Sequence, residues 1–219
     1  MHSTVQNLID IEENIKSHLS DLKINNQTKI IAVSKTFKVD KILPLIQHGH
    51  VDFGENKVQE AVDKWTNLKG ENPNLRLHMI GRLQTNKVKY AVKLFDYIHS
   101  VDNEKLARKI AEEDKKINKK TKVFIQVNIG EEEQKSGVSK VDLHKLVSYC
   151  KEVKLDVIGL MCIPPFDMNS TIYFKEMNKL NKDFGFSELS MGMSSDYLKA
   201  SEHSATYVRI GSSIFGQRV

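Results

Sequence analysis

Lys35 is the residue whose position in the sequence most directly suggests chemistry. It follows the β-branched, apolar run 28–34 (TKIIAVS), which is typical of a strand buried on both faces. In parallel α/β folds the carboxyl ends of strands face the ligand crevice. A lysine partly desolvated there has a lowered pKa and can attack a carbonyl carbon to form a Schiff base. On this stretch alone, a surface lysine in a strand-to-helix loop is the simpler interpretation.

Other polar residues fall at or near the ends of predicted strands: Asn56, His78, Asn128, Ser190 and Arg209. Two glycine-bearing turns, at 190–196 and 209–213, follow the last two predicted strands, where α/β barrels commonly bind phosphate. Backbone N–H groups at the start of a helix in such a turn can bind an anion. Together with a strand-end lysine, the turns suggest a phosphorylated carbonyl ligand that is held covalently.

Eight short apolar runs alternate with helical patterns and would position these residues. They are predicted at 28–34, 51–56, 75–80, 97–101, 122–129, 157–163, 188–190 and 206–210. The run 188–190 is the weakest of them. This alternation favours a single closed (β/α)₈ barrel, with a doubly wound open sheet as the main alternative.

Helix signals lie between these runs. An amphipathic helix containing Val5 and Leu22 precedes the first strand and is expected to end near Asn25–Asn26. Asp102 is the predicted N-cap of a helix at 103–118. The segment Ser139–Asp142 has a capping-box pattern that opens another helix.

Composition limits the protein class. The chain has 219 residues, 40% hydrophobic and 28% charged, which fits one domain. The net charge of +5 is spread along the chain, which argues against a nucleic-acid-binding tail and suits a small anionic ligand. The two cysteines form no CxxC pair, and the N-terminus has no apolar signal core, so we expect a cytoplasmic location. No apolar stretch approaches the length of a membrane-spanning helix, and we expect no membrane association.

Several motifs occur in the order typical of one family. The chain resembles the YggS/PROSC family of pyridoxal 5′-phosphate-binding proteins, also called pyridoxal phosphate homeostasis proteins. The resemblance covers essentially the whole chain. The matching segments are AVSKT at 32–36, FGENKVQE at 53–60, HMIGRLQTNK at 78–87, KSG at 135–137, GLM at 159–161, LSMGMS at 189–194 and VRIG at 208–211.

The resemblance implies a fold and a cofactor. The expected fold is a single (β/α)₈ TIM barrel of the alanine racemase N-terminal type, a fold-type III pyridoxal phosphate protein, with an extra N-terminal helix. One pyridoxal-phosphate-binding domain would span residues 1–219. Lys35 matches the Schiff-base lysine, and Arg209 matches the arginine that faces the pyridine nitrogen of the cofactor.

The resemblance also implies the other cofactor-binding residues. Those matching phosphate-binding positions are Ser194, Gly211 and Ser212, with Ser190 nearby. Those matching residues that line the cofactor pocket are Asn56, His78 and Met161. The run 200–206 departs from the family pattern, which usually has a hydrophobic residue after Ala200 and a glycine where Ser204 stands.

Chemistry favours a carrier over an enzyme. An arginine stays protonated, so a pyridine nitrogen facing Arg209 would remain unprotonated and the ring would be a poorer electron sink. Racemisation needs a base on each face of the substrate carbon. In fold-type III racemases, the second base is a tyrosine from a C-terminal β-domain of the partner subunit. The sequence ends at Val219, directly after the last barrel element, so we expect no such domain and a monomer.

Three functional hypotheses follow. The first is a homeostasis protein that holds pyridoxal phosphate and hands it over, with apo pyridoxal-phosphate enzymes as candidate partners. The second is a pyridoxal-phosphate enzyme acting on amino acids, either a weak racemase or one with an unknown substrate. The third is a Schiff-base aldolase that uses Lys35 without a cofactor.

We expect His78 to form pocket wall rather than to act in acid–base catalysis, and Lys135 to be a solvated loop charge. His48 and His50 flank Gly49 in a turn, so we expect no metal site there.

Overall fold

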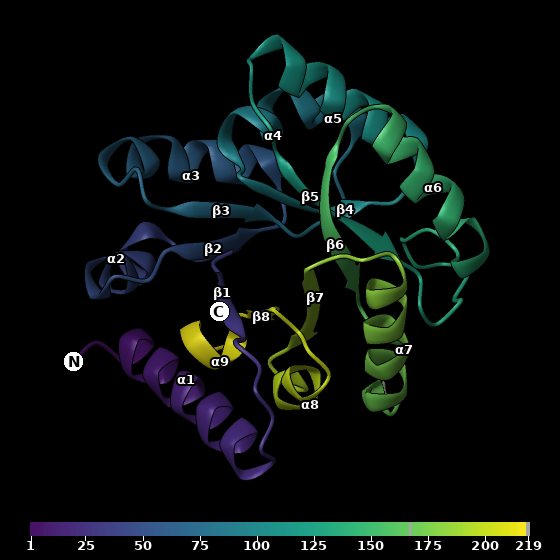
Figure 1. Cartoon of the computed structure of the whole chain (residues 1–219). Coiled ribbons are helices and arrows are strands. Elements are labelled where there is room, and N and C mark those ends of the chain that lie inside the picture. The colour runs from purple at the N-terminus through teal and green to yellow at the C-terminus, as the bar shows by residue number, and fades with distance from the viewer. Residues whose placement is uncertain (167, 218–219) are drawn as a thin grey trace.

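Eight parallel strands form a closed barrel in which each strand pairs with the next and β8 pairs with β1 (Figure 1). The computed structural model describes residues 1–166 and 168–217. The strands are β1 (Lys29–Val33), β2 (Asp52–Glu55), β3 (Arg76–Met79), β4 (Tyr97–Val101), β5 (Lys122–Val127), β6 (Asp156–Cys162), β7 (Glu188–Met193) and β8 (Tyr207–Ile210). The closed barrel confirms the predicted fold class and excludes the open sheet.

Helices surround the barrel and connect successive strands (Figure 1). They are α2 (Val39–His48), α3 (Val58–Glu71), the 3₁₀ helix η1 (Thr85–Lys87), α4 (Val88–Leu94), α5 (Glu104–Lys116), α6 (Lys140–Glu152), α7 (Ser170–Asp183) and α8 (Tyr197–Glu202). The short α9 (Ser212–Phe215) follows β8. The extra N-terminal helix is α1 (Ser3–Asp21), which packs against α2, α8 and α9. Asn7 of α1 donates a hydrogen bond to the Ile214 carbonyl (2.9 Å), so the first and last helices are joined.

The core has two layers. The larger one lies between the outer face of the barrel and the helices, where Trp65, Phe53 and Phe174 are fully buried. The smaller one fills the barrel interior and consists of Ile31, Tyr97, Phe124, Met161 and Tyr207. The barrel is therefore packed rather than hollow, as is usual for eight strands.

Several element boundaries differ from the expectation, among them those of β7, α1 and α5. Strand β7 runs to Met193 instead of stopping at residue 190, and α1 ends at Asp21, before Asn25–Asn26. Helix α5 is capped by Asn103 and not by Asp102. The Asn103 side chain accepts a hydrogen bond from the Leu106 N–H (2.9 Å). The helix begins at Glu104, which leaves Asp102 one position too early to reach the free N–H groups of the first turn.

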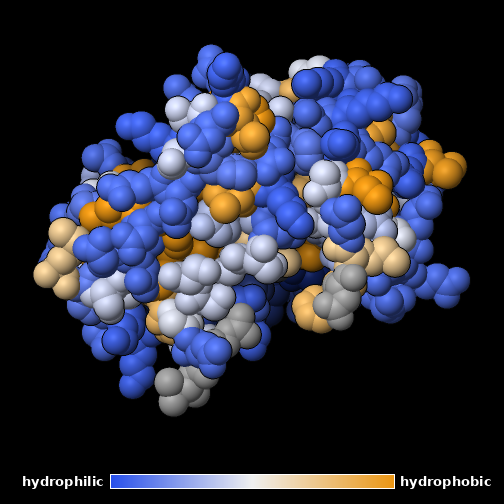
Figure 2. Space-filling model, turned by 90° about the horizontal axis from the view of Figure 1, so that it is seen from below, coloured by the Kyte–Doolittle hydropathy of each residue, from blue (hydrophilic) through white to orange (hydrophobic). Residues whose placement is uncertain are grey.

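Polar side chains dominate the face seen in Figure 2, where hydrophobic residues are scattered among hydrophilic ones. Across residues 1–166 and 168–217, no helix has both the length and the apolar character needed to cross a membrane.

Candidate functional site

A cavity of about 780 Å³ lies where the carboxyl ends of several strands meet. Six of the nine predicted cofactor-binding residues line it: Lys35, Asn56, Ser194, Arg209, Gly211 and Ser212. They come from the ends of β1, β2, β7 and β8, which are remote in sequence. Barrel closure brings β8 beside β1, and this pairing places Arg209 and Lys35 around one space.

Lys35 sits on a turn that is held in an unusual conformation. It follows Ser34 at the end of β1 and is half-buried. Thr36 has a φ of 69°, in the left-handed region that a β-branched residue rarely occupies. The Thr36 N–H donates to Glu60 Oε1 (2.6 Å), and this bond helps to offset the cost of the conformation. The direction of Lys35 is therefore set by α3 as well as by β1.

A buried carboxylate braces the same turn from behind. Glu55, at the end of β2, is fully buried, and its Oε1 accepts hydrogen bonds from Ser34 Oγ (2.8 Å) and Trp65 Nε1 (3.0 Å). Lys64 Nζ is 2.9 Å from the same oxygen and donates to the Ser34 carbonyl (2.9 Å). Bonds to one charged oxygen thus link β1, β2 and α3. Sequence reasoning gave Glu55, Lys64 and Trp65 no role in the site.

Arg209 supplies a positive charge at the base of the cavity. Its side chain is buried, with Nη1 donating to Ser190 Oγ (2.7 Å) and Nη2 donating to the Cys162 carbonyl (2.9 Å). Burial lowers the pKa of Arg209 from its usual value, but a guanidinium starts so high that it stays protonated at neutral pH. Arg209 can therefore donate hydrogen bonds and cannot accept one.

Hydroxyl groups form another part of the cavity wall. Ser194 and Ser212 line it, with Ser195 beside them and Gly211 at the start of α9. Gly192, just before this turn, has a φ of 90°, and a Cβ there would lie 2.5 Å from Ala200 Cβ. The turn after β7 therefore requires glycine, and it presents hydroxyl donors suited to an anion.

Asn56 contributes an acceptor. Its Oδ1 is buried and has no hydrogen-bond partner within the described part of the chain. Gly81 faces it, and a Cβ at Gly81 would overlap the Asn56 backbone oxygen, so only glycine permits this close approach. An unpaired buried acceptor is costly, and a donor on a ligand would satisfy it.

The other three predicted residues, His78, Met161 and Ser190, lie one layer below the cavity. All three are fully buried and are not among its lining residues. The reason is strand periodicity: side chains two residues apart share a face. Ile80 and Ile163, two residues after His78 and Met161, line the cavity instead. Ser190 reaches the site only through its bond to Arg209.

Lys135 differs from the solvated charge that was expected. Its Nζ is 2.6 Å from Glu132 Oε2 and donates to the Pro164 carbonyl (3.3 Å). It therefore joins the loop after β5 to the loop after β6.

Comparison with known proteins adds family evidence. Residues 7–219 match the family described as alanine racemase, N-terminal domain. The chain is 40% identical to a pyridoxal phosphate homeostasis protein of Aquifex aeolicus, with 88% of each protein covered. It is 36% identical to the human pyridoxal phosphate homeostasis protein, covering 88% of this chain and 77% of that one.

Solved structures agree with this likeness. The structure of PipY from Synechococcus elongatus with pyridoxal phosphate bound matches with a TM-score of 0.82 and 31% identity, over 92% of this chain and all of that one. An alanine racemase from Clostridium difficile matches with a TM-score of 0.74 at 17% identity, over 99% of this chain and 57% of the racemase. The second likeness is one of fold.

Proposed function

This chain belongs to the pyridoxal phosphate homeostasis proteins within the alanine racemase N-terminal-domain family, and we propose that it binds pyridoxal 5′-phosphate covalently through Lys35 and buffers or delivers it. One observation supports the covalent assignment best. The cavity has an amine, a fixed guanidinium and a hydroxyl-bearing turn on its walls. These are the three groups that an aldehyde, a pyridine nitrogen and a phosphate would need.

The residues present fit the cofactor. Bound pyridoxal phosphate supplies an aldehyde that condenses with an amine and a ring that withdraws electrons. Lys35 is the amine, held by the Thr36 turn. Arg209 can donate a hydrogen bond to an unprotonated ring nitrogen but does not release its proton. Ser194, Ser212 and the backbone at Gly211 would bind the phosphate. Asn56 Oδ1 would accept a hydrogen bond from a donor group of the cofactor.

The walls of the cavity favour storage over turnover. In residues 1–166 and 168–217, the lining side chains include no histidine, tyrosine, aspartate or glutamate. Lys35 is therefore the sole candidate base there, whereas racemisation needs proton transfer at both faces of a carbon. Because Arg209 does not protonate the ring nitrogen, the ring stabilises a carbanion poorly. The alternative, an amino-acid enzyme, would need a base from elsewhere.

Replacing Lys35 by alanine tests the covalent assignment. We expect the Lys35→Ala protein to lose the visible absorbance of bound cofactor and the adduct that borohydride fixes to the chain, which peptide mass analysis would otherwise find on Lys35. Its thermal melt should change little, because the side chain lies at the cavity wall and not in a core layer. The matched control is Lys57→Ala, an exposed lysine outside this cavity, which should retain both signals. A full-strength adduct on another lysine in Lys35→Ala would overturn the assignment.

A further inference from the structure

A line of polar side chains crosses the barrel interior beneath the cavity. It joins residues of five strands by hydrogen bonds: Asp52 (β2), His78 (β3), His99 (β4), Ser190 (β7) and Arg209 (β8). The distances are 2.9 Å for Asp52 Oδ1–His78 Nε2, 3.0 Å for His78 Nδ1–His99 Nε2, 2.9 Å for His99 Nδ1–Ser190 Oγ and 2.7 Å for Arg209 Nη1–Ser190 Oγ. We call these five residues the interior relay.

The interior relay is buried and rigid. Its five members have exposed fractions between 0% and 5%. The His78 ring stacks on Tyr97 with ring centroids 4.3 Å apart and an angle of 8°, and the His99 ring stacks on Phe124 at 4.3 Å. Both imidazoles are therefore fixed in plane, and neither can rotate without disturbing the packed barrel interior.

The partners fix the direction of every bond. The Asp52 carboxylate accepts only, so His78 carries its proton on Nε2 and presents a bare Nδ1. His99 must then donate from Nε2, which leaves its own Nδ1 as the acceptor of the Ser190 hydroxyl. The Ser190 oxygen in turn accepts from Arg209, which can only donate. All four bonds thus run one way, from the guanidinium to the carboxylate.

The charges agree with this order. Burial lowers the pKa of His78 and lowers that of His99 well below the usual value, so both rings are neutral at pH 7. Burial tends to raise the pKa of Asp52, but the bonds from His78 and Arg76 outweigh it and hold the pKa at about 2. The other charged groups that act on the two rings are Arg76, Asp96 and Arg209.

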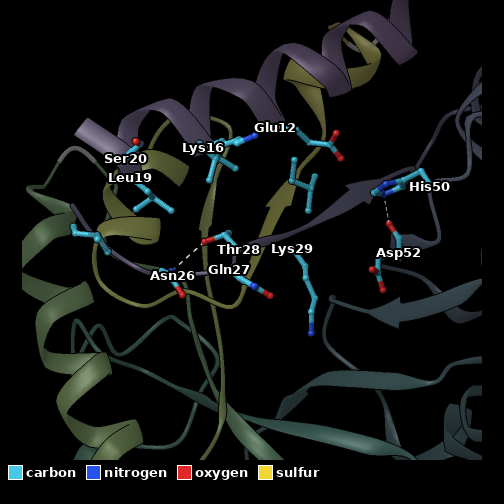
Figure 3. A pocket seen from close by; sticks show the side chains of 13 residues that line it. Glu12, Lys16, Leu19, Ser20, Asn26, Gln27, Thr28, Lys29, His50 and Asp52 are labelled. Atoms are coloured by element: carbon cyan, nitrogen blue, oxygen red, sulfur yellow. Dashed lines mark hydrogen bonds between the residues drawn. The ribbon is translucent and has the colours of Figure 1, made fainter. Parts of the chain in front are cut away.

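The far end of the interior relay lies beside a second cavity. Asp52 Oδ1 and Oδ2 accept two bonds from Arg76, at 2.7 and 2.5 Å. Asp52 also lines a cavity of about 530 Å³ between α1 and the start of β1 and β2, shown in Figure 3. There Lys29 and Asp52 extend their side chains away from α1 (Figure 3). The interior relay therefore spans the barrel from one end to the other.

We propose that Asp52, His78 and His99 are positioning residues that hold Arg209 in one orientation and stabilise its charge. The two hydrogen-bond partners of Arg209 are neutral oxygens, and the nearby charge of Asp196 acts on it without a hydrogen bond between them. A buried guanidinium that is not hydrogen-bonded to a carboxylate is costly. The interior relay reduces that cost, because it connects the guanidinium to the Asp52 carboxylate through the aligned dipoles of three neutral groups. These groups are the Ser190 hydroxyl and the His99 and His78 rings. The effect on cofactor retention rests on the proposed function, whereas the hydrogen-bond order does not.

Ring-nitrogen NMR of the cofactor-free protein tests the order. With ¹⁵N-labelled histidine, we expect His78 and His99 each to show a protonated Nε2 and a bare Nδ1, with no titration between about pH 5.5 and 8.5, because both rings are buried and neutral. Either ring protonated on both nitrogens, or protonated on Nδ1 alone, would overturn the proposal. This measurement needs no variant and no cofactor.

Interrupting the interior relay tests its effect on Arg209. His99→Phe keeps a ring that can stack on Phe124 but removes both hydrogen bonds. We expect bound pyridoxal phosphate to dissociate up to about tenfold faster, which is the upper end of the loss expected for one hydrogen bond between neutral groups. His99→Gln, whose amide offers an acceptor and a donor, should recover part of the loss. Tyr207→Phe is the matched control, since Tyr207 packs on both imidazoles outside the interior relay, and its rate should match the parent.

The outcomes separate this proposal from the proposed function. If His99→Phe retains the cofactor as the parent does, or if His99→Gln dissociates as fast as His99→Phe, the positioning role is wrong and the carrier proposal stands. If the parent protein binds no pyridoxal phosphate, the carrier proposal fails, and the NMR experiment still decides the order of the interior relay.

Discussion

At the scale of single residues, buried ionisable groups shape the candidate site. Glu55 fixes the turn that aims Lys35, and Asp52 ends the interior relay that reaches Arg209. Both carboxyl groups are inside the protein and both accept several hydrogen bonds, which makes each a fixed point for neighbouring strands. The two residues expected to contact the cofactor most closely are thus oriented by side chains that do not touch it.

The neutral histidines of the interior relay predict a pH dependence of stability. In the unfolded chain, His99 has a pKa near 6.5. In the folded protein burial lowers that pKa, so this contribution to stability is fully present above about pH 6.5 and is lost as the pH falls. Below that pH the unfolded chain binds a proton that the folded chain does not. The free energy of unfolding should then fall by about 1.4 kcal/mol per pH unit for this histidine.

Urea unfolding of the parent and of His99→Phe between about pH 5 and 6.5 measures the contribution of His99 to the pH dependence of stability. We expect the free energy of unfolding to change less steeply with pH in His99→Phe, because phenylalanine does not titrate. The difference in slope should correspond to nearly one bound proton. Tyr207→Phe retains both histidines of the interior relay and should keep the parent slope. Equal slopes in His99→Phe and the parent would mean that His99 binds its proton as readily in the folded protein as in the unfolded chain.

At the scale of elements, the ends of the helices set where the next strands begin. Helix α8 ends in a Schellman motif, in which Ala205 N–H bonds to the Ala200 carbonyl (3.1 Å) and Ser204 N–H bonds to the Ser201 carbonyl (3.3 Å). Ser204 holds the left-handed position, with a φ of 69°. Helix α7 ends the same way, with Gly185 at the equivalent position and a φ of 71°. The departure from the family pattern at Ser204 therefore puts serine where the backbone favours glycine.

Ser204→Gly should stabilise the protein by about 1 kcal/mol, because a side chain in the left-handed region costs about 1–2 kcal/mol and glycine's extra chain entropy offsets part of the gain. Loss of the hydrogen bond between Asn178 Nδ2 and Ser204 Oγ (3.2 Å) reduces this gain in stability slightly. Thermal and urea unfolding measure the change. Gly185→Ser is the reverse control and should destabilise by a similar amount, since a Cβ there meets no atom within 4 Å and the effect is that of the backbone alone. A destabilised Ser204→Gly would contradict this account of the α8 end.

The sequence predicted the parts of the site that depend on local pattern. Strand periods and the alternation with helices placed Lys35 and Arg209 at strand ends, and barrel closure then brings them together. The resemblance to a family supplied the cofactor. The depth of His78 was missed because Ile80, which follows the end of β3 and lies two residues after His78, lines the cavity, and the histidine lies one layer below it.

The interior relay had little local signal in the sequence. His99 lies in the middle of β4, and Asp52 begins β2, where polar residues are common. Their contact with His78 depends on which side chains of neighbouring strands face inward at the same height, which is set by register. The left-handed turn at Thr36 was also not predictable, because threonine does not favour it and Glu60, from α3, stabilises it. The one available clue was His99, an ionisable residue in the middle of the fully buried strand β4.

At the scale of the whole molecule, the barrel separates two environments. One end has the cavity with Lys35 and Arg209, and the other has the cavity beside α1 where Asp52 meets Arg76. The end with Lys35 provides a single candidate base among its described lining side chains. This asymmetry predicts how the loaded protein treats amino acids, and it distinguishes a carrier from a racemase.

Amino acids should undergo at most slow proton exchange on the loaded protein. A base on one side can return a proton only to the face from which it was removed, so any deuterium that enters Cα from deuterated water should do so with retention of configuration. We expect exchange of L-alanine and L-serine far below about 1 s⁻¹, the lower end of typical enzyme turnover. NMR measures deuterium incorporation, and chiral chromatography measures the D-isomer. Free pyridoxal phosphate at the same concentration is the control.

Racemisation at about 1 s⁻¹ or faster would refute the carrier proposal, because it needs a second base that the described cavity walls do not provide. The complementary measurement mixes loaded protein with an apo pyridoxal-phosphate enzyme and follows the gain in that enzyme's activity. Activation faster than the independently measured dissociation of cofactor from Lys35 would establish direct delivery. Activation at the dissociation rate would restrict the role to buffering, since transfer would then pass through free cofactor in solution.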